Sequence, residues 1–320
     1  MKHSQIPPFL ASLLKFWYLV TSADKRGEIT SSFFLSLVKR VVRMSLLQSI
    51  LLGIIQGITE FLPISSTAHL TIAGTAMGVI NPERPDEWTA FIAVMQIGTL
   101  AAVVVYFFKD LVDIVKGFFV DGLRYVQSPS NGLGKARMGW YIILGTLPVA
   151  TFGLLFKKII EGNLTKSLSV IGTSLIVLAL ILWLAEKIGS RTKEMKSATW
   201  LDSLIVGFAQ SLALIPGSSR SGTTITAGLF LGITREDAAR FSFLLSIPAV
   251  FASGVLELYQ MRHFIHDVGI MNVVASTVVA GIVGYASIAF LLKYLRTHTT
   301  FLFIYYRIAL GTTLLAIAFR

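Results

Sequence analysis

The chain has 320 residues, of which 54% are hydrophobic and 14% charged, and its mean hydropathy is +0.73. A soluble domain carries roughly 25% charged residues, so this composition excludes an ordinary soluble protein and is typical of a chain that crosses a membrane several times. The net charge of +11 does not indicate nucleic-acid binding, because the basic residues lie in loops between apolar runs, and the absence of cysteine excludes disulfides and thiolate metal sites.

The first 43 residues differ from the rest of the chain. Their basic residues are Lys2, Lys15, Lys25, Arg26, Lys39, Arg40 and Arg43. Residues 7–22 are too short for a confident membrane span, and they lack the small-residue cleavage site of a signal peptide. We therefore predict that residues 1–43 are an extension that does not belong to the membrane domain, that Met44 is the natural start, and that residues 44–320 form the membrane domain.

The first apolar segment of that domain is interrupted at Pro63. Polar and ionisable side chains surround the break, and they are Gln56, Glu60, Ser65, Ser66, Thr67 and His69. Two short apolar arms on either side of a break are typical of a re-entrant helical hairpin. Backbone at such a break is tolerated at membrane depth only where protein or a water-filled cavity satisfies its polar groups.

Three full spans follow, near residues 88–108, 139–156 and 167–185, each about 20 residues long, as a bilayer crossing requires. A second interrupted segment then copies the first: a Gly, a Gln three residues later, a Pro and a Ser-Ser pair. Its polar residues are Gln210, Ser218, Ser219, Arg220, Ser221 and Thr224. The last three spans lie near 241–259, 272–292 and 301–319, so the chain contains an internal repeat.

The number of spans between the hairpins predicts how the repeats are related. Three spans separate the hairpins, and an odd number inserts the second half upside down. We therefore predict an all-α polytopic membrane protein with six transmembrane helices, two re-entrant helical hairpins and two inverted-topology repeats, at about 44–186 and 200–320. In such proteins the site lies near the midplane, where the hairpin tips meet.

The loops predict the orientation. One side carries Lys109, Lys116, Arg124, Lys135, Arg137, Lys187, Arg191, Lys193, Lys196, Arg235, Arg240, Lys293 and Arg296. The other side carries Arg84, Lys157, Lys158, Lys166, Arg262 and Arg320. By the positive-inside rule the richer side is cytoplasmic, so the first hairpin opens outward. This prediction holds only if the N-terminal extension is set aside.

Few ionisable groups lie at membrane depth. Glu60 is the one acid plainly inside a hydrophobic stretch, His69 is the one histidine in a repeat, and Arg220 and Arg307 are embedded bases. A charge at the bilayer centre costs roughly 2.5 kcal/mol or more, so such groups usually line a functional cavity. Glu60 has a structural alternative, which is a simple pairing with Arg220 or Arg307.

These groups indicate a phosphate site. Arg220 offers a planar fork for phosphate oxygens, and a helix that begins after each break adds N–H donors. Gln56 and Glu60 are four residues apart, on one helix face, and could hold a hard divalent cation such as Mg²⁺ or Ca²⁺. Ser66 or His69 could attack phosphorus while the other handles protons. Spacing alone does not choose between them.

Two motifs in these segments resemble one known family. Gln56-x-x-x-Glu60 and the run Pro216-Gly-x-Ser-Arg-Ser-x-x-Thr224 match the two signatures of the undecaprenyl-diphosphate phosphatase family, which is linked to bacitracin resistance. The resemblance covers about residues 44–320. It implies a multi-pass enzyme of the bacterial plasma membrane, with its active site facing outward, that removes the terminal phosphate of undecaprenyl diphosphate and recycles the monophosphate carrier for peptidoglycan synthesis.

The resemblance also implies roles for individual residues. Catalysis would involve Glu60, Ser66, His69 and Arg220, and diphosphate binding would involve Ser65, Thr67, Ser219, Arg220, Ser221 and Thr224. Many members have Glu where this chain has Gln56, which weakens a cation site built on two carboxylates. A transporter or flippase of polyprenyl phosphate is the alternative, because inverted repeats also build alternating-access proteins. The partners would be this lipid and the surrounding membrane lipids; oligomeric state is left open.

Overall fold

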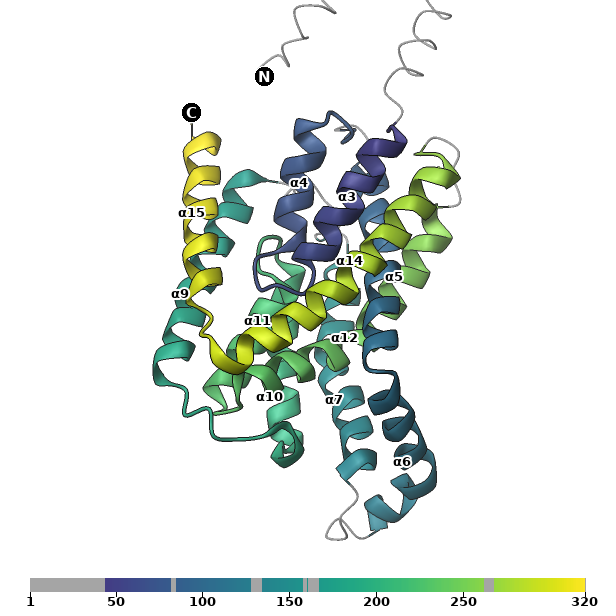
Figure 1. The fold of residues 1–320 in the computed structure, drawn as a ribbon, viewed down its shortest axis with the longest axis vertical. Coiled ribbons are helices and arrows are strands. Elements are labelled where there is room, and N and C mark those ends of the chain that lie inside the picture. Colours follow the sequence, from purple (N-terminus) through teal and green to yellow (C-terminus); the bar gives the residue numbers. More distant parts are fainter. Residues whose placement is uncertain are drawn as a thin grey trace, which may run out of the picture. The chain divides into compact units, whose positions relative to one another are not determined.

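A computed structural model describes residues 44–81, 85–127, 134–157, 160, 167–261 and 268–319. The prediction that residues 1–43 stand apart from the membrane domain concerns residues outside these ranges. Within them the chain is helical and has no β-sheet, apart from an isolated bridge between Lys193 and Ile233. The ribbon in Figure 1 shows how these helices are arranged.

Six long helices confirm the predicted spans. They are α5 (Pro85–Tyr106), α7 (Gly134–Leu155), α9 (Leu168–Ile188), α12 (Arg235–Met261), α14 (Ile270–Thr297) and α15 (Phe301–Ala318). Each contains a stretch long and apolar enough to cross a membrane. The region between the first two spans, expected to be a loop, contains a further helix, α6 (Phe108–Gln127). Its regularly spaced charges interrupt the apolar run, so hydropathy alone did not reveal it.

The two interrupted segments each form a pair of short helices. The first pair is α3 (Leu46–Thr59) with α4 (Ser66–Ala76), and the second is α10 (Trp200–Ser211) with α11 (Arg220–Phe230). A 3₁₀ turn, η3 (Leu212–Leu214), continues α10, and another, η2 (Met195–Ser197), precedes it. The members of each pair pack together (Figure 1). None of the four reaches the length of the six spans, as expected for segments broken by proline.

The first helix of each pair begins in the same way but packs on a different neighbour. Capping boxes start both helices, with Ser45 and Gln48 at α3 and with Thr199 and Asp202 at α10. Such a box satisfies two of the N–H groups left free at a helix start. The helices nevertheless pack on different neighbours, because α3 contacts α14 whereas α10 contacts α7.

A glycine makes each of these contacts close. A Cβ atom on Gly53 would lie 2.5 Å from the carbonyl oxygen of Ser276 on α14. A Cβ atom on Gly207 would lie 2.3 Å from the carbonyl oxygen of Gly145 on α7. Small residues allow membrane helices to approach in this way. The Gly that opens each copy of the repeat is therefore a packing residue.

The largest buried apolar cluster among the described residues includes the turn of the first pair. Phe61 and Ile64 in that turn pack with residues of α11, α12 and α14. Phe61 meets Phe243 edge to face, with ring centroids 5.2 Å apart. Because Phe61 is 1% exposed and follows Glu60, its packing fixes the backbone that carries this carboxylate.

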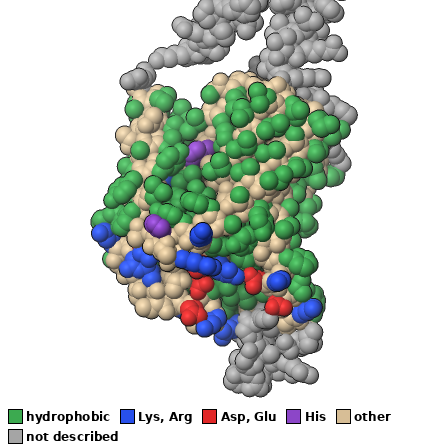
Figure 2. Space-filling view, viewed as in Figure 1, with side chains coloured by type: hydrophobic (Ala, Val, Ile, Leu, Met, Phe, Trp, Pro, Cys, Tyr) green, Lys and Arg blue, Asp and Glu red, His purple; other side chains and the backbone are tan. Residues whose placement is uncertain are grey.

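Charged side chains gather in a band toward one end of the domain, whereas most of the face shown in Figure 2 is hydrophobic. Buried Glu186 on α9 accepts hydrogen bonds from Arg235 Nε on α12 and from the Thr300 hydroxyl at the start of α15, both at 2.8 Å. Lys193 pairs with Asp202 at 2.5 Å. The Glu186 contacts join α9, α12 and α15, and the Lys193 pair ties the loop before α10 to that helix.

Candidate active site

Strained serines start the second helix of each pair. Ser65 has φ 75° and caps α4, accepting a hydrogen bond from the Ala68 N–H at 3.4 Å. Ser219 has φ 66° and caps α11, accepting from the Gly222 N–H at 3.2 Å. A positive φ is unfavourable for residues other than glycine, and it occurs preferentially at functional sites. The two turns are therefore built alike and are candidates for function.

These caps revise how the two copies of the repeat align. The sequence pairs Ser65-Ser66 with Ser218-Ser219, but the structure makes Ser65 equivalent to Ser219. The second turn has one more residue between its proline and its cap than the first. As a result Ser66 and Arg220 occupy the same place, as the first residue of α4 and of α11.

Glu60 joins the two turns. Its Oε1 accepts a hydrogen bond from Arg220 Nη2 at 3.0 Å, and its Oε2 accepts one from the Ser66 hydroxyl at 2.7 Å. Gln56 Nε2 donates to the same Oε2 at 2.9 Å. Only 5% of the Glu60 side chain and 13% of the Arg220 side chain is exposed. A buried carboxylate is thus neutralised by a guanidinium and hydrogen-bonded to a hydroxyl.

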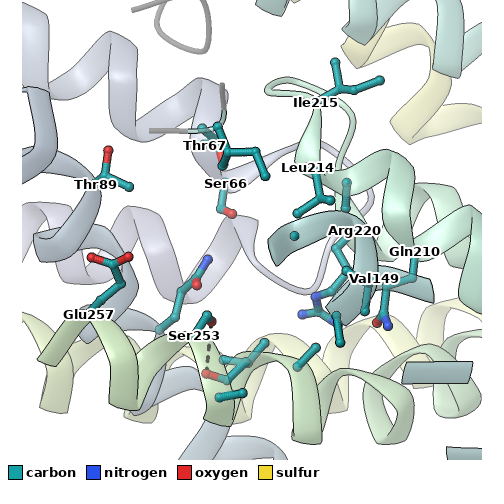
Figure 3. A pocket seen from close by; sticks show the side chains of 18 of the residues that line it. Ser66, Thr67, Thr89, Val149, Gln210, Leu214, Ile215, Arg220, Ser253 and Glu257 are labelled. Carbon is teal, nitrogen blue, oxygen red and sulfur yellow. Dashed lines mark hydrogen bonds between the residues drawn. The ribbon is translucent and has the colours of Figure 1, made fainter. Parts of the chain in front are cut away.

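A cavity of about 590 Å³ opens beside this cluster (Figure 3). We call it the polar pocket. The sequence-predicted residues that line it are Glu60, Ser65, Ser66, Thr67, Ser219 and Arg220. Glu257, Lys157 and Thr89 line it as well, from the ends of α12, α7 and α5. Its size is in the usual range for small-molecule sites.

Ser221 and Thr224 do not line the polar pocket. The Ser221 hydroxyl donates to the Leu62 carbonyl at 3.2 Å, which connects α11 to the turn of the first pair. The Thr224 hydroxyl bonds to the Arg220 carbonyl at 2.8 Å and to Ser242 Oγ at 2.6 Å. Both side chains are buried, so their contacts hold α11 in place around Arg220.

His69 also lies outside the pocket lining. Its Nδ1 is 2.7 Å from the Ser65 carbonyl, which can only accept, so this nitrogen carries the proton. Its Nε2 then accepts from the Tyr306 hydroxyl at 2.6 Å, and the two rings stack with centroids 5.6 Å apart. His69 therefore braces the Ser65 turn against α15 and makes no hydrogen bond to Ser66 or Glu60 among those of the described residues.

Gln56 and Glu60 do not make a ready-made cation site. The amide of Gln56 presents its nitrogen to Glu60, and its Oε1 is buried without a partner among the described residues. Both oxygens of Glu60 already accept hydrogen bonds. In the part of the chain that the structure describes, no group of three or more His, Cys, Asp or Glu residues could hold a metal ion. The donor set fits a divalent cation poorly.

Gln210 was not predicted as a site residue. It lines the polar pocket from α10, and it is the counterpart of Gln56 in the second copy of the repeat. The residue is 1% exposed, and neither its Nε2 nor its Oε1 has a hydrogen-bond partner among the described residues. A buried amide without partners is costly. Gln210 and Arg220 both line the polar pocket (Figure 3), which makes this amide a candidate contact for a ligand.

We predict that Gln210→Leu separates folding from binding. Leucine removes an unsatisfied amide, so thermal unfolding in detergent is expected at an unchanged or higher temperature. Loss of a hydrogen bond to a charged ligand group is expected to weaken ligand binding by roughly tenfold or more. Substrate titration of turnover measures this as a higher KM. An unchanged KM would mean that the amide serves only the fold.

A family model and individual relatives of known name both match this chain over most of its length. The model of the family "Bacitracin resistance protein BacA" matches residues 49–313. The chain is 55% identical to the undecaprenyl-diphosphatase of Syntrophobacter fumaroxidans over 277 residues, which cover 87% of this chain and 99% of that relative. It is 53% identical to the undecaprenyl-diphosphatase of Chlorobium phaeobacteroides over 283 residues, which cover 86% of this chain and 97% of that relative.

Proposed function

The chain belongs to the bacitracin resistance protein BacA family, and on this premise we propose that the polar pocket is the active site at which it hydrolyses undecaprenyl diphosphate. The chain is an integral membrane hydrolase that removes the terminal phosphate of this lipid to give undecaprenyl phosphate, the carrier of peptidoglycan synthesis, and thereby confers bacitracin resistance. The observation that carries the proposal is the Glu60 cluster, in which a hydroxyl, a carboxylate and a guanidinium meet.

The hydrogen bond from Ser66 to Glu60 supports Ser66 as the nucleophile. As Ser66 Oγ bonds to the terminal phosphorus, its proton passes to Glu60 Oε2. This oxygen already accepts the hydrogen bond of the Ser66 hydroxyl, with 2.7 Å between the two oxygens. The bond from that phosphorus to the bridging oxygen breaks, and undecaprenyl phosphate leaves with this oxygen. Water then attacks the phosphoserine, Glu60 mediates the proton transfer, and inorganic phosphate and the free serine are released.

Arg220 binds the phosphates. Its fork suits the oxygens of a phosphoryl group, whose charge is spread over those oxygens in the transition state. The starts of α4 and α11 both contribute to the pocket lining and add the positive ends of two helix dipoles. Ser65, Thr67 and Ser219 complete the wall around the head group. Ser221 and Thr224 act on the substrate only through the helix that carries Arg220.

His69 takes a supporting role in this proposal. Its two nitrogens are engaged by the Ser65 carbonyl and the Tyr306 hydroxyl, so it is not placed to exchange protons with Ser66. By fixing the Ser65 turn it orients Ser66, the next residue. The sequence left the choice between Ser66 and His69 open, and these contacts support Ser66.

A divalent cation, Mg²⁺ or Ca²⁺, enters the proposal only through the diphosphate. Such ions are commonly bound through one or two carboxylates together with substrate phosphates. We predict that titrating Mg²⁺ into the purified protein gives no saturable heat in calorimetry. When methylenediphosphonate is present, we expect saturable heat in excess of that from the same titration without protein. Saturable binding to the protein alone would show that Gln56 and Glu60 form a preformed site after all.

The repeats and the orientation are part of the same proposal. Exchanging the two halves maps the contact of α3 with α14 onto that of α10 with α7, which supports two inverted repeats with re-entrant pairs. The basic residues Arg191, Lys193, Arg235, Arg240 and Arg296, which form ion pairs, belong to the loops counted as cytoplasmic, which supports an outward-facing site in the plasma membrane.

Phosphate release by purified protein in detergent micelles tests the function. The hydrolase is expected to release inorganic phosphate from undecaprenyl diphosphate, with the monophosphate lipid as the second product. A transporter or flippase needs anion binding but no nucleophile, so it would move polyprenyl phosphate across vesicles and release nothing in micelles. Absence of phosphate release would overturn the proposal.

A further inference from the structure

A second cavity, of about 740 Å³, lies next to the polar pocket. We call it the apolar groove. Its walls come from α7 and the residues after it, from α9, and from α10 with η3, and they include Phe152, Phe156, Val170, Phe208 and Leu212. The Phe152 ring lies 6.0 Å from the Phe156 ring and 6.4 Å from the Phe208 ring, measured between centroids, which gives the groove an aromatic side.

The groove offers almost nothing to a polar ligand. Among the described residues that line it, Ser211 contributes the one polar side chain, and that hydroxyl donates to the Gly207 carbonyl of its own helix at 3.3 Å. Phe208 and Leu212 are about half exposed, at 52% and 44%, so the groove is open at its side. An occupant is therefore apolar and can enter from the bilayer.

The groove and the polar pocket are continuous. Ile160, Leu214 and Ile215 line both cavities. Pro216 lines the groove and Gly217, the next residue, lines the polar pocket. The groove thus meets the polar pocket at the Pro216–Gly217 peptide bond, two residues before the Ser219 cap. When the anionic head of a molecule lies at Arg220, its apolar part can extend into the groove.

We propose that the apolar groove binds the head-proximal isoprene units of the polyprenyl chain. This inference rests on the proposed function, since it places the tail of the same substrate whose diphosphate binds at Arg220. A tail that continues from a head at Arg220 passes the apolar residues shared by the two cavities, Ile160, Leu214 and Ile215, and reaches the groove, whose described lining is almost entirely apolar. Burial of the branched chain against Phe152 and Phe208 supplies affinity by the hydrophobic effect.

Substitutions at the half-exposed walls test this with two substrates. Leu212→Trp fills the groove and Phe208→Ala removes part of its wall. Each is expected to raise the KM for undecaprenyl diphosphate about tenfold, while kcat/KM for dimethylallyl diphosphate, which has one isoprene unit, stays much closer to that of the wild type. Matched controls are Leu201→Trp on α10 and Phe290→Ala on α14, which are half exposed but do not line the groove.

The outcomes are distinct. Equal losses with both substrates, or no loss with either, overturn the groove as a tail site while wild-type turnover leaves the proposed function standing. Failure of the wild type to release phosphate overturns the function itself. A photoreactive group on the third isoprene unit, which dimethylallyl diphosphate lacks, is expected to label residues 208–216, and excess undecaprenyl phosphate is expected to prevent the labelling. Competition by phosphatidylethanolamine alone would assign the groove to bulk lipid and contradict the proposal.

Discussion

Ser66→Ala is expected to abolish phosphate release from undecaprenyl diphosphate, with a fall in kcat of roughly 10⁴-fold or more, as for removal of other enzymatic nucleophiles. The substitution removes the Oγ that would bond to phosphorus. It leaves Glu60 paired with Arg220 and Gln56, so the protein is expected to fold and to bind the lipid. Single-turnover phosphate release measures the effect. In the wild type, rapid quenching and mass spectrometry are expected to find phosphoserine at position 66.

A buried serine elsewhere provides the control. The Ser276 hydroxyl donates to the Val273 carbonyl of its own helix at 3.0 Å and is fully buried, but it does not line the polar pocket. Ser276→Ala is expected to keep normal turnover. Full activity in Ser66→Ala together with loss of activity in His69→Ala would reverse the assignment and make the histidine the nucleophile.

Arg220→Lys is expected to lower kcat/KM by roughly 10²–10³-fold, the usual effect of losing a donor to transition-state charge. Lysine keeps a positive charge near Glu60, so the buried carboxylate is not left uncompensated and the fold is expected to survive. It does not keep the planar fork that binds two phosphate oxygens together. Steady-state turnover measures the loss, and thermal unfolding in detergent checks the fold.

Arg240 offers a matched control for this change. Arg240 lies on α12 and does not line the polar pocket, and its Nη2 pairs with Asp110 at 2.8 Å. Arg240→Lys is expected to change activity little. A near-normal kcat/KM in Arg220→Lys would mean that charge alone suffices at this position, and it would contradict bidentate binding of the phosphates.

Much of the fold follows from local sequence. Apolar runs predicted the six long helices, and the two prolines with their hydroxyl clusters predicted the two pairs of short helices. The amphipathic helix α6 escaped prediction because its charges interrupt the apolar pattern. The scarcity of ionisable groups at depth singled out Glu60 and Arg220, which the structure brings together, and also His69 and Arg307.

The sequence by itself determined which segments enter the membrane, where they break and which reactive side chains they carry, because hydropathy and helix-breaking residues act locally. Only the tertiary structure decided how those side chains meet. It paired Glu60 with Arg220, 160 positions away, and turned His69 toward Tyr306. Each residue along a helix rotates the side chain by about 100°. Ser65, the cap outside α4, is turned to the Ala68 N–H, and Ser66, the next residue, faces the carboxylate.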